Sequence, residues 1–487
     1  MAATTAVPVR TGPATKGNGL LLLGVLGGMF LAMLDQTIVG TALPRITADF
    51  GGAGLYTWVV TAYLLTSTVT VPLYGRLSDA YGRKPLLLIG IVVFLLGSVL
   101  CGLAQNMGQL IAFRGVQGLG AGALLPLSLA LVADLFPPDR SGRVQGAIGA
   151  VMAGSYIAGP FLGGFFTDHA SWRWAFFVNI PIGAVLLLII VSRLPRVPGT
   201  GGSRPDYAGI AVFTVAISAL LLGLTEKGLD GHTWTSAPVI GPLVAAAVLL
   251  GVFVLVESRA EQPIIPLHLF RNPTYTIVNI TSFFTASCLF AGAVFLPRFF
   301  QQAQGQTATS SGLHIYPLML GMVTGSILTG MLISKTRRYK PWLLAAPFLI
   351  IAGALLCSGL AVDTPTWSLV AWMALIGLGI GPMLSGLTVA IQYSVPPSYI
   401  GTASANLTFF RQIGGSVALA IAGTAYTSVV GDQAAGHATM AQAHAAAAAT
   451  VIPWLAVAGA VVALVALVFL PGRVVPALAA GRVAAAD

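Results

Sequence analysis

One stretch of the sequence decides the fold: Gly75-Arg76-Leu77-Ser78-Asp79-Ala80-Tyr81-Gly82-Arg83-Lys84-Pro85. Its two glycines permit a tight reversal between the long apolar runs on either side, and the proline suits the first turn of the next helix. Its one acid can cap a helix end or pair with Arg83. The plain interpretation is a charged loop that anchors two membrane helices. The sharper one is a latch that holds one conformation and breaks in another. The latch residues would be Gly75, Asp79, Gly82, Arg83 and Lys84.

The composition of the whole chain indicates a membrane protein. Of its 487 residues, 24 are Lys or Arg and 14 are Asp or Glu, so 8% are charged, against about 25% in a typical soluble domain. Hydrophobic residues make up 56%, and the mean hydropathy is +0.89. So few charges cannot cover the surface of a water-soluble protein of this size. The composition excludes a soluble enzyme, a disordered chain and a secreted disulfide scaffold, and it predicts an all-α polytopic membrane protein.

Fourteen apolar runs are long enough to cross a bilayer as helices, which takes about 20 residues each. Seven lie at roughly 19–43, 55–75, 86–104, 109–134, 143–166, 175–194 and 207–225. Seven more lie at roughly 237–257, 274–297, 309–334, 341–361, 366–393, 400–429 and 450–470. The remaining residues form loops and tails, which leaves no room for a soluble catalytic domain. The Ala-rich stretch 433–449 is expected to be an external loop, with a short helix as the alternative.

The placement of the basic residues follows from this topology. If the amino terminus is cytoplasmic and the loops alternate, 18 of the 24 basic residues lie on the cytoplasmic side. Two, Arg114 and Arg411, fall inside helices, and four lie outside: Arg45, Arg173, Lys227 and Arg298. This distribution agrees with the positive-inside rule, so the net charge of +10 needs no nucleic acid to explain it. We expect a multi-pass protein of the cell (inner or plasma) membrane with both termini cytoplasmic.

The chain contains an internal repeat. Residues 118–142 match residues 377–401 without a gap, at a constant offset of 259. Leu43-Pro44-Arg45 likewise matches Leu296-Pro297-Arg298, and Lys84-Pro85 matches Lys340-Pro341. We interpret residues 1–196 and 266–487 as two six-helix bundles, joined by two additional transmembrane helices in residues 197–265. Duplicated halves that face each other across a midplane site are typical of transporters, although a duplication can also serve assembly alone.

Two charged residues within the spans are candidates for proton chemistry. Asp35 lies in the first span and Arg114 near the start of the fourth. A charge at the bilayer centre costs about 2.5–3.5 kcal/mol on insertion scales, so an unpaired role is not expected. The matching positions of the second half hold Cys288 and Met373, so the pair does not belong to the duplicated architecture. Burial favours the neutral form of a carboxyl group, whereas a nearby cation favours the ionised form. A moving cation can therefore switch the protonation of a buried carboxylate. A static ion pair is the alternative.

The latch stretch resembles the signature G-x-L-x-D-x-x-G-R-K/R of the major facilitator superfamily, which is complete here. Four further motifs narrow the resemblance to the fourteen-helix drug:proton antiporter branch. They are Leu34-Asp35-Gln36-Thr37-Ile38-Val39 with Ala42-Leu43-Pro44, Arg114-Gly115-Val116-Gln117-Gly118, the run from Gly154 to Gly164, and the run from Trp172 to Pro181. The resemblance covers essentially the whole chain. It implies a major-facilitator-like fold and proton-coupled export of lipophilic drugs or toxic compounds by alternating access, without a cofactor.

The resemblance also implies roles for single residues. Asp35 would be the proton carrier and cation sensor, and Arg114 its modulator. The antiporter motif of span five would pack closely enough to seal one side of the protein while the halves rock. Its residues are Gly154, Gly159, Pro160, Gly163 and Gly164.

Substrate-binding candidates are polar, aromatic or cationic side chains that we expect at mid-depth in the membrane. For each aromatic or amide side chain, ordinary packing is the alternative. The candidates are Trp58, Tyr63, Gln117, Asn279, Phe283, Asn406 and Arg411. Spans nine to fourteen contain no interior Asp or Glu, which favours monocationic or neutral lipophiles over dications. Asp134 and His314 are interpreted as structural residues. The alternative for Asp134 is a role in proton coupling, and that for His314 is titration of its imidazole at physiological pH.

Other classes of function fit the sequence less well. A membrane-embedded enzyme would need a His/Asp, Ser/His or metal cluster, but the six histidines are scattered, so we expect neither an enzyme nor a metal site. An exporter dedicated to one natural product, siderophore or lipid, and a transporter-like sensor, remain as alternatives. We expect a monomer whose partners are a small lipophilic substrate, protons and membrane lipid, and not nucleic acid.

Overall fold

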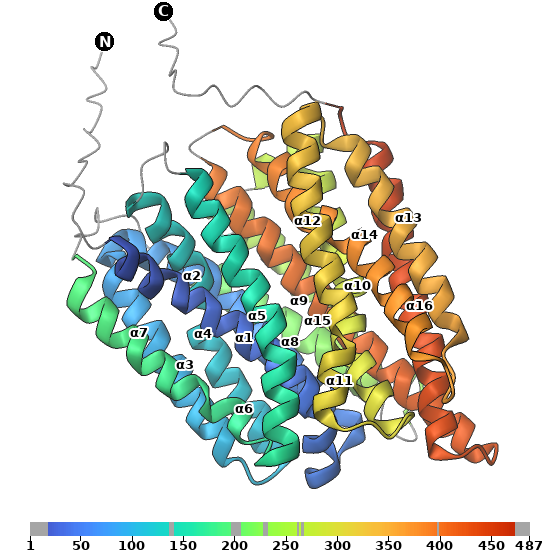
Figure 1. Cartoon of the computed structure of the whole chain (residues 1–487). Helices are drawn as coiled ribbons and strands as arrows, with labels where there is room; N and C mark the ends of the chain where they lie inside the picture. Colours follow the sequence, from blue (N-terminus) through green and yellow to red (C-terminus); the bar gives the residue numbers. More distant parts are fainter. Residues whose placement is uncertain are drawn as a thin grey trace, which may run out of the picture.

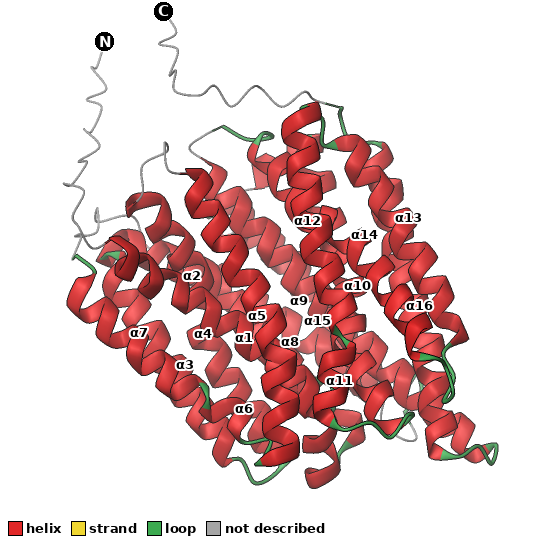
Figure 2. Cartoon of the chain, in the orientation of Figure 1, coloured by secondary structure: helices red, strands yellow, loops and turns green. Residues whose placement is uncertain are grey.

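The computed structural model describes residues 18–135, 141–195, 206–226, 232–260, 263, 267–396 and 399–472. Helices account for almost all of them (Figure 2). The first half contains α1 (Asn18–Phe50), α2 (Trp58–Tyr81), α3 (Arg83–Leu103), α4 (Met107–Leu135), α5 (Ser141–His169), α6 (Trp174–Phe177) and α7 (Asn179–Arg193). Two helices follow, α8 (Tyr207–Glu226) and α9 (Ala237–Arg259). The second half contains α10 (Pro273–Gln302), α11 (Ala308–His314), α12 (Tyr316–Thr336), α13 (Lys340–Leu356), α14 (Thr366–Gln392), α15 (Ile400–Ala435) and α16 (Met440–Val468). Short 3-10 helices are η1 (Ala53–Leu55), η3 (Leu267–Arg271) and η4 (Cys357–Gly359).

The described residues include 12 helical segments that are long and apolar enough to cross a membrane. These segments correspond to twelve of the fourteen predicted runs. The other two runs, 55–75 and 143–166, form helices α2 and α5, which are not among the candidate spans. The all-α, multi-pass prediction is therefore confirmed, while the count of fourteen spans stays a prediction.

Helix boundaries differ from the prediction in four places. The predicted loop at 75–85 is reduced to Gly82, because α2 continues to Tyr81 and α3 begins at Arg83; Gly82 adopts a φ of 91°, which favours glycine. The predicted loop at 433–449 is reduced to residues 436–439, because α15 continues to Ala435 and α16 begins at Met440. Alanine is the strongest helix former, so an Ala-rich stretch extends the neighbouring helices. The runs 175–194 and 309–334 are each divided into a short and a long helix.

The internal repeat reappears as a repeat of helix packing. In the first half α4 packs against α2 and α3, and α1 packs against α5 and α7. In the second half α14 packs against α12 and α13, and α10 packs against α15 and α16. The two inserted helices pack against each other, and α8 also contacts α2 and α15 (Figure 1). Sequence-matched helices therefore have matched neighbours in the two halves.

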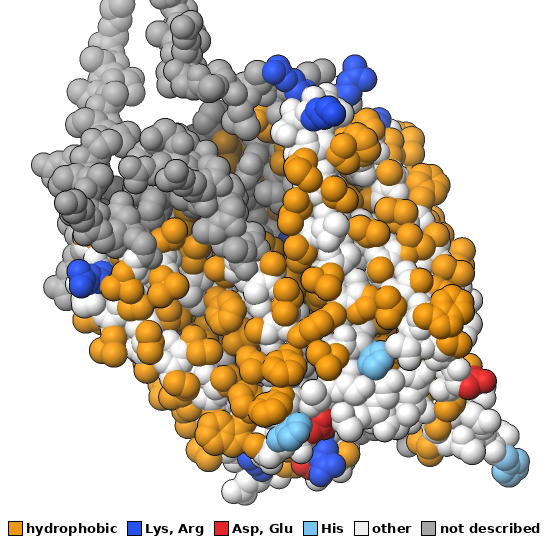
Figure 3. Space-filling model, viewed as in Figure 1, with side chains coloured by type: hydrophobic (Ala, Val, Ile, Leu, Met, Phe, Trp, Pro, Cys, Tyr) orange, Lys and Arg blue, Asp and Glu red, His pale blue; other side chains and the backbone are white. Residues whose placement is uncertain are grey.

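The outer surface separates charge from apolar side chains. Figure 3 shows hydrophobic side chains over the middle of the bundle, with Lys, Arg, Asp and Glu side chains near its ends. Exposed apolar residues such as Leu188, Val248 and Phe348 are 60–71% accessible, which suits contact with lipid tails. Four basic residues lie at one end of the bundle where α12 meets α13. Lys335 is in the last turn of α12, Arg337 and Arg338 are in the connection, and Lys340 begins α13.

Candidate functional site

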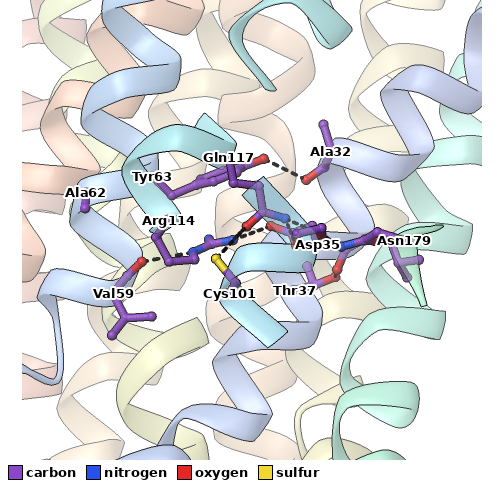
Figure 4. Close-up of polar contacts among 12 residues, drawn as sticks. Ala32, Asp35, Thr37, Val59, Ala62, Tyr63, Cys101, Arg114, Gln117 and Asn179 are labelled. Carbon is purple, nitrogen blue, oxygen red and sulfur yellow. Dashed lines mark hydrogen bonds and ion pairs between the residues drawn. The ribbon is translucent and has the colours of Figure 1, made fainter. Parts of the chain in front are cut away.

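The ion pair in the first half joins α1 and α4. Asp35 lies near the middle of α1, and its Oδ2 atom is 2.6 Å from Nη1 of Arg114; neither side chain has any exposed surface. Figure 4 shows the two side chains pointing toward each other between the helices. The structure thus brings together the two residues that the sequence singled out for proton coupling. A buried pair of this kind needs further hydrogen bonds to offset the loss of hydration.

Two amide side chains supply those hydrogen bonds to the second carboxylate oxygen. Gln117 Nε2 donates to Oδ1 of Asp35 at 2.7 Å, and Asn179 Nδ2 of α7 donates to the same atom at 2.9 Å. Both amides also donate to Oγ of Ser98 on α3, each at 2.8 Å. Gln117 and Arg114 share one face of α4 because they are three residues apart. The carboxylate of α1 is therefore held by α3, α4 and α7 together, and we name these five residues the Asp35 network.

Sequence reasoning missed two members of the Asp35 network. Asn179 appeared only within a motif at the entry to span six, and Ser98 was not noticed. Both are completely buried. A signal was present, since each is a lone polar residue in a strongly apolar run, and buried polar groups require partners. The sequence does not indicate which distant helix provides the partner.

Arg114 makes contacts beyond the ion pair. Its Nε donates to the carbonyl oxygen of Val59 at 3.1 Å, and its Nη1 also donates to Oε1 of Gln117 at 2.7 Å. The guanidinium lies 4.1 Å from the ring centroid of Tyr63, a favourable cation–π distance. Its Nη2 has no hydrogen-bond partner among the described residues. The guanidinium therefore retains one free donor for another acceptor.

The positions of the second half that match Asp35 and Arg114 are described, and they hold no ion pair. Cys288, at the position that matches Asp35, is 2% exposed, and its thiol contacts the carbonyl oxygen of Ala456 at 3.3 Å. Met373, which matches Arg114, is 1% exposed within the apolar core. The positions in the second half that match the ion pair are therefore uncharged.

The predicted substrate-binding residues fall into separate places. Gln117 belongs to the Asp35 network, and the ring of Tyr63 packs against Arg114 of that network. Asn406 Nδ2 donates to the hydroxyl of Tyr275 at 2.8 Å, and Asn279 bonds the carbonyl oxygen of the same tyrosine at 2.9 Å. Trp58 and Phe283 pack against the apolar cluster that joins α2, α8 and α15. The structure thus brings some of these candidates together in pairs but not into one described cavity.

Arg411 lies in the middle of α15 and is half-buried. It has no hydrogen-bond or ion-pair partner among the described residues. Its neighbour Gln412 accepts a 2.6 Å hydrogen bond from Thr68 of α2 and so links the two halves at mid-depth. Arg411 is therefore a second cation with free donors, on the opposite half from Arg114.

The latch residues connect helices of the first half in this structure. Arg83 donates to the carbonyl oxygen of Ala130 on α4, and Lys84 Nζ donates to the carbonyl oxygens of Val191 and Leu194 at 2.9 and 2.6 Å. These bonds satisfy carbonyl groups at helix ends, which basic side chains favour. Gly75 lies within α2. The side chains of Asp79 and Asp134 lie outside the part of the chain whose side chains are described.

The antiporter motif lies where α5 meets both α1 and the second half. Gly159 and Gly163 face Thr37 and Thr41 of α1, so closely that no Cβ atom would fit. Gly164 faces the backbone of Ala308 and Thr309 in α11 in the same way, and Gly312 faces the carbonyl of Pro160. Gly154 has more space, since its nearest neighbour is a Phe30 ring atom at 3.9 Å. The motif therefore seals the two halves against each other along its later part.

Hydrogen bonds close the same end of the interface. Both carboxylate oxygens of Asp168 accept backbone N–H bonds from α11, from Ala308 at 3.0 Å and Thr309 at 2.7 Å. Burial by itself would raise the pKa of Asp168, but these bonds together with those from threonine hydroxyls outweigh it and hold the pKa below its ordinary value. The Tyr316 hydroxyl donates to the carbonyl oxygen of Ile157 at 2.8 Å. We name these contacts between α5 and the α11–α12 segment the α5–α11 closure.

Metal ligands do not gather in the described structure. Within those residues no group of three or more His, Cys, Asp or Glu side chains lies together. His314 Nδ1 lies 2.7 Å from the carbonyl oxygen of Ser310 in its own helix, in line with a hydrogen-bonded structural residue. The chemistry available at the site is therefore that of one carboxylate, its cation and neutral amides.

A duplicated bundle of membrane helices with a buried ion pair in one half has the architecture of a membrane transport protein. The family model described as Major Facilitator Superfamily matches residues 25–419, and the chain belongs to this family. It is 38% identical over 404 residues to Multidrug transporter protein MdtP of Bacillus subtilis (strain 168), which covers 83% of this chain and 74% of that protein. It is 37% identical over 409 residues to Multidrug resistance protein 3 of the same organism, covering 84% and 80%.

The fold agrees with solved structures. The crystal structure of an auto inhibited POT family peptide transporter superposes with a TM-score of 0.64, covering 91% of this chain and 95% of that one, at 16% identity. At this identity the similarity shows the fold alone. Together the findings identify a multi-pass membrane transporter with a small-molecule substrate, and they point away from an enzyme.

Proposed function

We propose that this protein is a proton-coupled antiporter that exports lipophilic monocationic or neutral compounds. The observation that carries the proposal is the Asp35 network: one buried carboxylate with one cation and three neutral partners. The matching positions of the second half do not repeat the ion pair. Charged residues at membrane depth are expensive to bury and mark ion or proton pathways. The two multidrug relatives support efflux of foreign compounds as the direction and breadth of transport.

The proposed topology has fourteen membrane helices. In this arrangement α2 and α5 cross the membrane together with the twelve candidate spans. They are 24 and 29 residues long, which is enough to span a bilayer. Their packing against α4 and α1 at the centre of the first half supports this assignment. Both termini then lie in the cytoplasm, and the α5–α11 closure lies on the outer side. The functional units are residues 1–196, 197–265 and 266–487.

In this topology the described conformation is closed on the outer side. Besides the α5–α11 closure, Gln301 of α10 donates to the carbonyl oxygen of Thr41 at 2.9 Å. The Tyr56 hydroxyl donates to the carbonyl oxygen of Val294 at 3.1 Å. All these bonds join the first half to the second. Alternating access would require them to break as the outer side opens.

Helix α1 provides a direct mechanical link between the proton site and this closure. Asp35 faces α3, α4 and α7, whereas Thr37 and Thr41 face α5; Thr37 Oγ1 lies 3.2 Å from the carbonyl oxygen of Ser155. Residues two positions apart lie on different faces of a helix. A shift of α1 caused by a change at Asp35 therefore moves the surface against which the antiporter motif packs.

The proposed coupling step is proton transfer to Asp35. A proton on Oδ2 removes the charge that holds Arg114 and turns an acceptor into a donor. Arg114 then needs another acceptor, and its Nη2 has donors that no described residue accepts. Inward movement of one proton across 100 mV supplies about 2.3 kcal/mol toward export. No metal or organic cofactor is needed.

A second candidate function is export of one dedicated compound, such as a natural product, siderophore or lipid. The same ion pair and closure would serve it. Transport by whole cells that express the protein tests the proposed function. Efflux of several unrelated lipophilic probes, abolished by a protonophore, is expected for the multidrug antiporter. Efflux that resists the protonophore would overturn proton coupling, and movement of none of the probes would favour the dedicated exporter.

A further inference from the structure

A second buried arginine lies at the end of the bundle where η1 meets α10, α15 and α16. Arg298 is 2% exposed, although it carries a permanent charge. Its guanidinium lies between two aromatic rings, 4.5 Å from the centroid of Tyr56 and 4.3 Å from that of Tyr426. Its Nε donates to Oε1 of Gln302 at 3.1 Å, whereas its Nη1 has no hydrogen-bond partner among the described residues. A buried guanidinium with an unpaired donor and no anion is energetically unfavourable unless another group binds it.

The internal repeat shows what this arginine lacks. Its counterpart in the first half, Arg45, pairs with Asp49 four residues later, at 3.3 Å from Nε to Oδ1. Four residues after Arg298 the sequence has Gln302 in place of an acid. Arg45 is also largely exposed, with 63% of its side chain accessible. The arginine of the second half is therefore buried, and the position of its expected counterion holds a neutral residue.

Arg298 is one of the residues that line a pocket of about 380 Å³. Its wall includes polar groups from Thr47, Gln302, Thr427 and His444, and apolar groups from Val430 and Met440. No acidic residue lines it. Two acids are sequence neighbours of this wall. Asp49 is occupied by Arg45 and by Trp172, whose Nε1 donates to it at 2.9 Å. Asp432, which follows Gly431, is exposed. The pocket thus offers one permanent cation, neutral hydrogen-bonding groups and an apolar side.

We propose that this pocket binds the carboxylate group of a small organic anion with an apolar body. One guanidinium matches one monoanion, and its planar donors suit the two oxygens of a carboxylate. The pocket volume lies in the range of small-molecule sites. In the proposed topology it lies on the outer side, next to the bonds that join α1 and η1 to α10. The ligand comes either from the external medium or, as a fatty acid, from the bilayer.

Equilibrium binding to the purified full chain in nanodiscs of saturated phosphatidylcholine tests the site. Salicylate is the soluble probe and decanoate the probe that partitions into the bilayer. Saturable binding of either one supports the site: salicylate assigns a ligand from the medium, and decanoate alone assigns one from the membrane. Saturable binding of neither probe overturns the proposal. In nanodiscs both faces of the protein share one buffer, and the measurement follows binding without transport. Failure of proton coupling therefore leaves this result unaffected.

Two substitutions locate the binding site. Arg298→Met should weaken probe binding by about tenfold or more, since a hydrogen-bonded charge pair is lost. Gln302→Glu restores the counterion that the first repeat has, in a side chain of nearly the same shape. It should weaken probe binding by a similar factor without lowering the melting temperature, and it decides the question if Arg298→Met does not fold. Arg45→Gln is the matched control and should bind the probe like the wild type. Unchanged affinity in both Arg298→Met and Gln302→Glu would show that Arg298 only supports the packing of the two tyrosines.

Discussion

Asp35 of α1 and Arg114 of α4 form a 2.6 Å ion pair between side chains that have no exposed surface. Removal of one member of such a pair leaves an uncompensated buried charge and costs about 3–5 kcal/mol. Intermediate separations of the two charges are therefore unfavourable. In the proposed mechanism the pair has two states: both charges together, or a protonated Asp35 with Arg114 bonded elsewhere. That property makes it suitable for coupling a proton to a conformational change.

A double-mutant cycle should reveal the energetic dependence between the two residues. We expect Arg114→Met alone to lower the thermal stability of the detergent-purified protein strongly, because Asp35 loses its cation. In an Asp35→Asn background the same substitution should be much less harmful, with a coupling energy of about 1–3 kcal/mol. The melting temperatures of the four proteins measure it. Additive effects of the two substitutions would show that the pair does not act as a unit.

Asn179 should behave as a positioning residue for Asp35. Asn179→Ala removes one of the two donors to Oδ1, so the carboxylate can turn away from its transport geometry. We expect the proton-driven transport rate to fall about tenfold, with a shift in its pH profile that a purely structural residue would not cause. Ser282→Ala, which removes a buried hydrogen bond to Leu407 in the second half, is the control. An Asn179→Ala protein with an unaltered pH profile would assign Asn179 to packing alone.

Close packing at Gly164 should be essential for closing the outer side. Gly164→Val places a branched side chain against the backbone of α11, so the two halves cannot approach as they do here. We expect transport to be lost while the protein still accumulates in the membrane. Gly330→Ala in α12, where nothing lies within 4 Å, should be neutral. Transport by the Gly164→Val protein at the wild-type rate would refute a role of this contact in the cycle.

The Asp168 contact should stabilise α11 over the whole physiological pH range. Its pKa is lowered from the ordinary 3.8, so the carboxylate contributes fully above that value, and the contribution is lost only as the pH falls through the lowered pKa. Asp168→Ala should therefore speed amide hydrogen exchange in residues 308–314 at pH 7. Asp363→Ala, an exposed acid in the connection before α14, should not. Equal exchange in the two variants would rule out the contact as a stabilising one.

Much of the fold follows from the sequence because long apolar runs and repeated glycines are local signals. The matched packing of α4 and α14 was expected from residues 118–142 and 377–401. The errors lie where local propensity extends a helix beyond its apolar part. The Ala-rich stretch 433–449 lacks the bulky apolar residues of a span, yet alanine propagates α15 and α16 through it.

The candidate site was only partly predictable for a different reason. Asp35 and Arg114 stand out because each is a charge in an apolar run. Ser98 and Asn179 are neutral, and their importance depends on partners 81 residues apart, which no periodicity reveals. Arg298 was assigned to an outer loop by charge counting. The structure instead places it in the last turns of α10 and buries it between two tyrosines, because aromatic rings can shelter a guanidinium.

Proton-driven transport by purified protein in proteoliposomes tests the central claim most directly. With an imposed pH gradient, uptake of ethidium or of a neutral probe such as chloramphenicol is compared between the wild type and Asp35→Asn. We predict gradient-driven accumulation by the wild type and none by Asp35→Asn, which should still exchange labelled for unlabelled substrate at equal pH. Gradient-driven accumulation by Asp35→Asn at the wild-type rate would contradict the account.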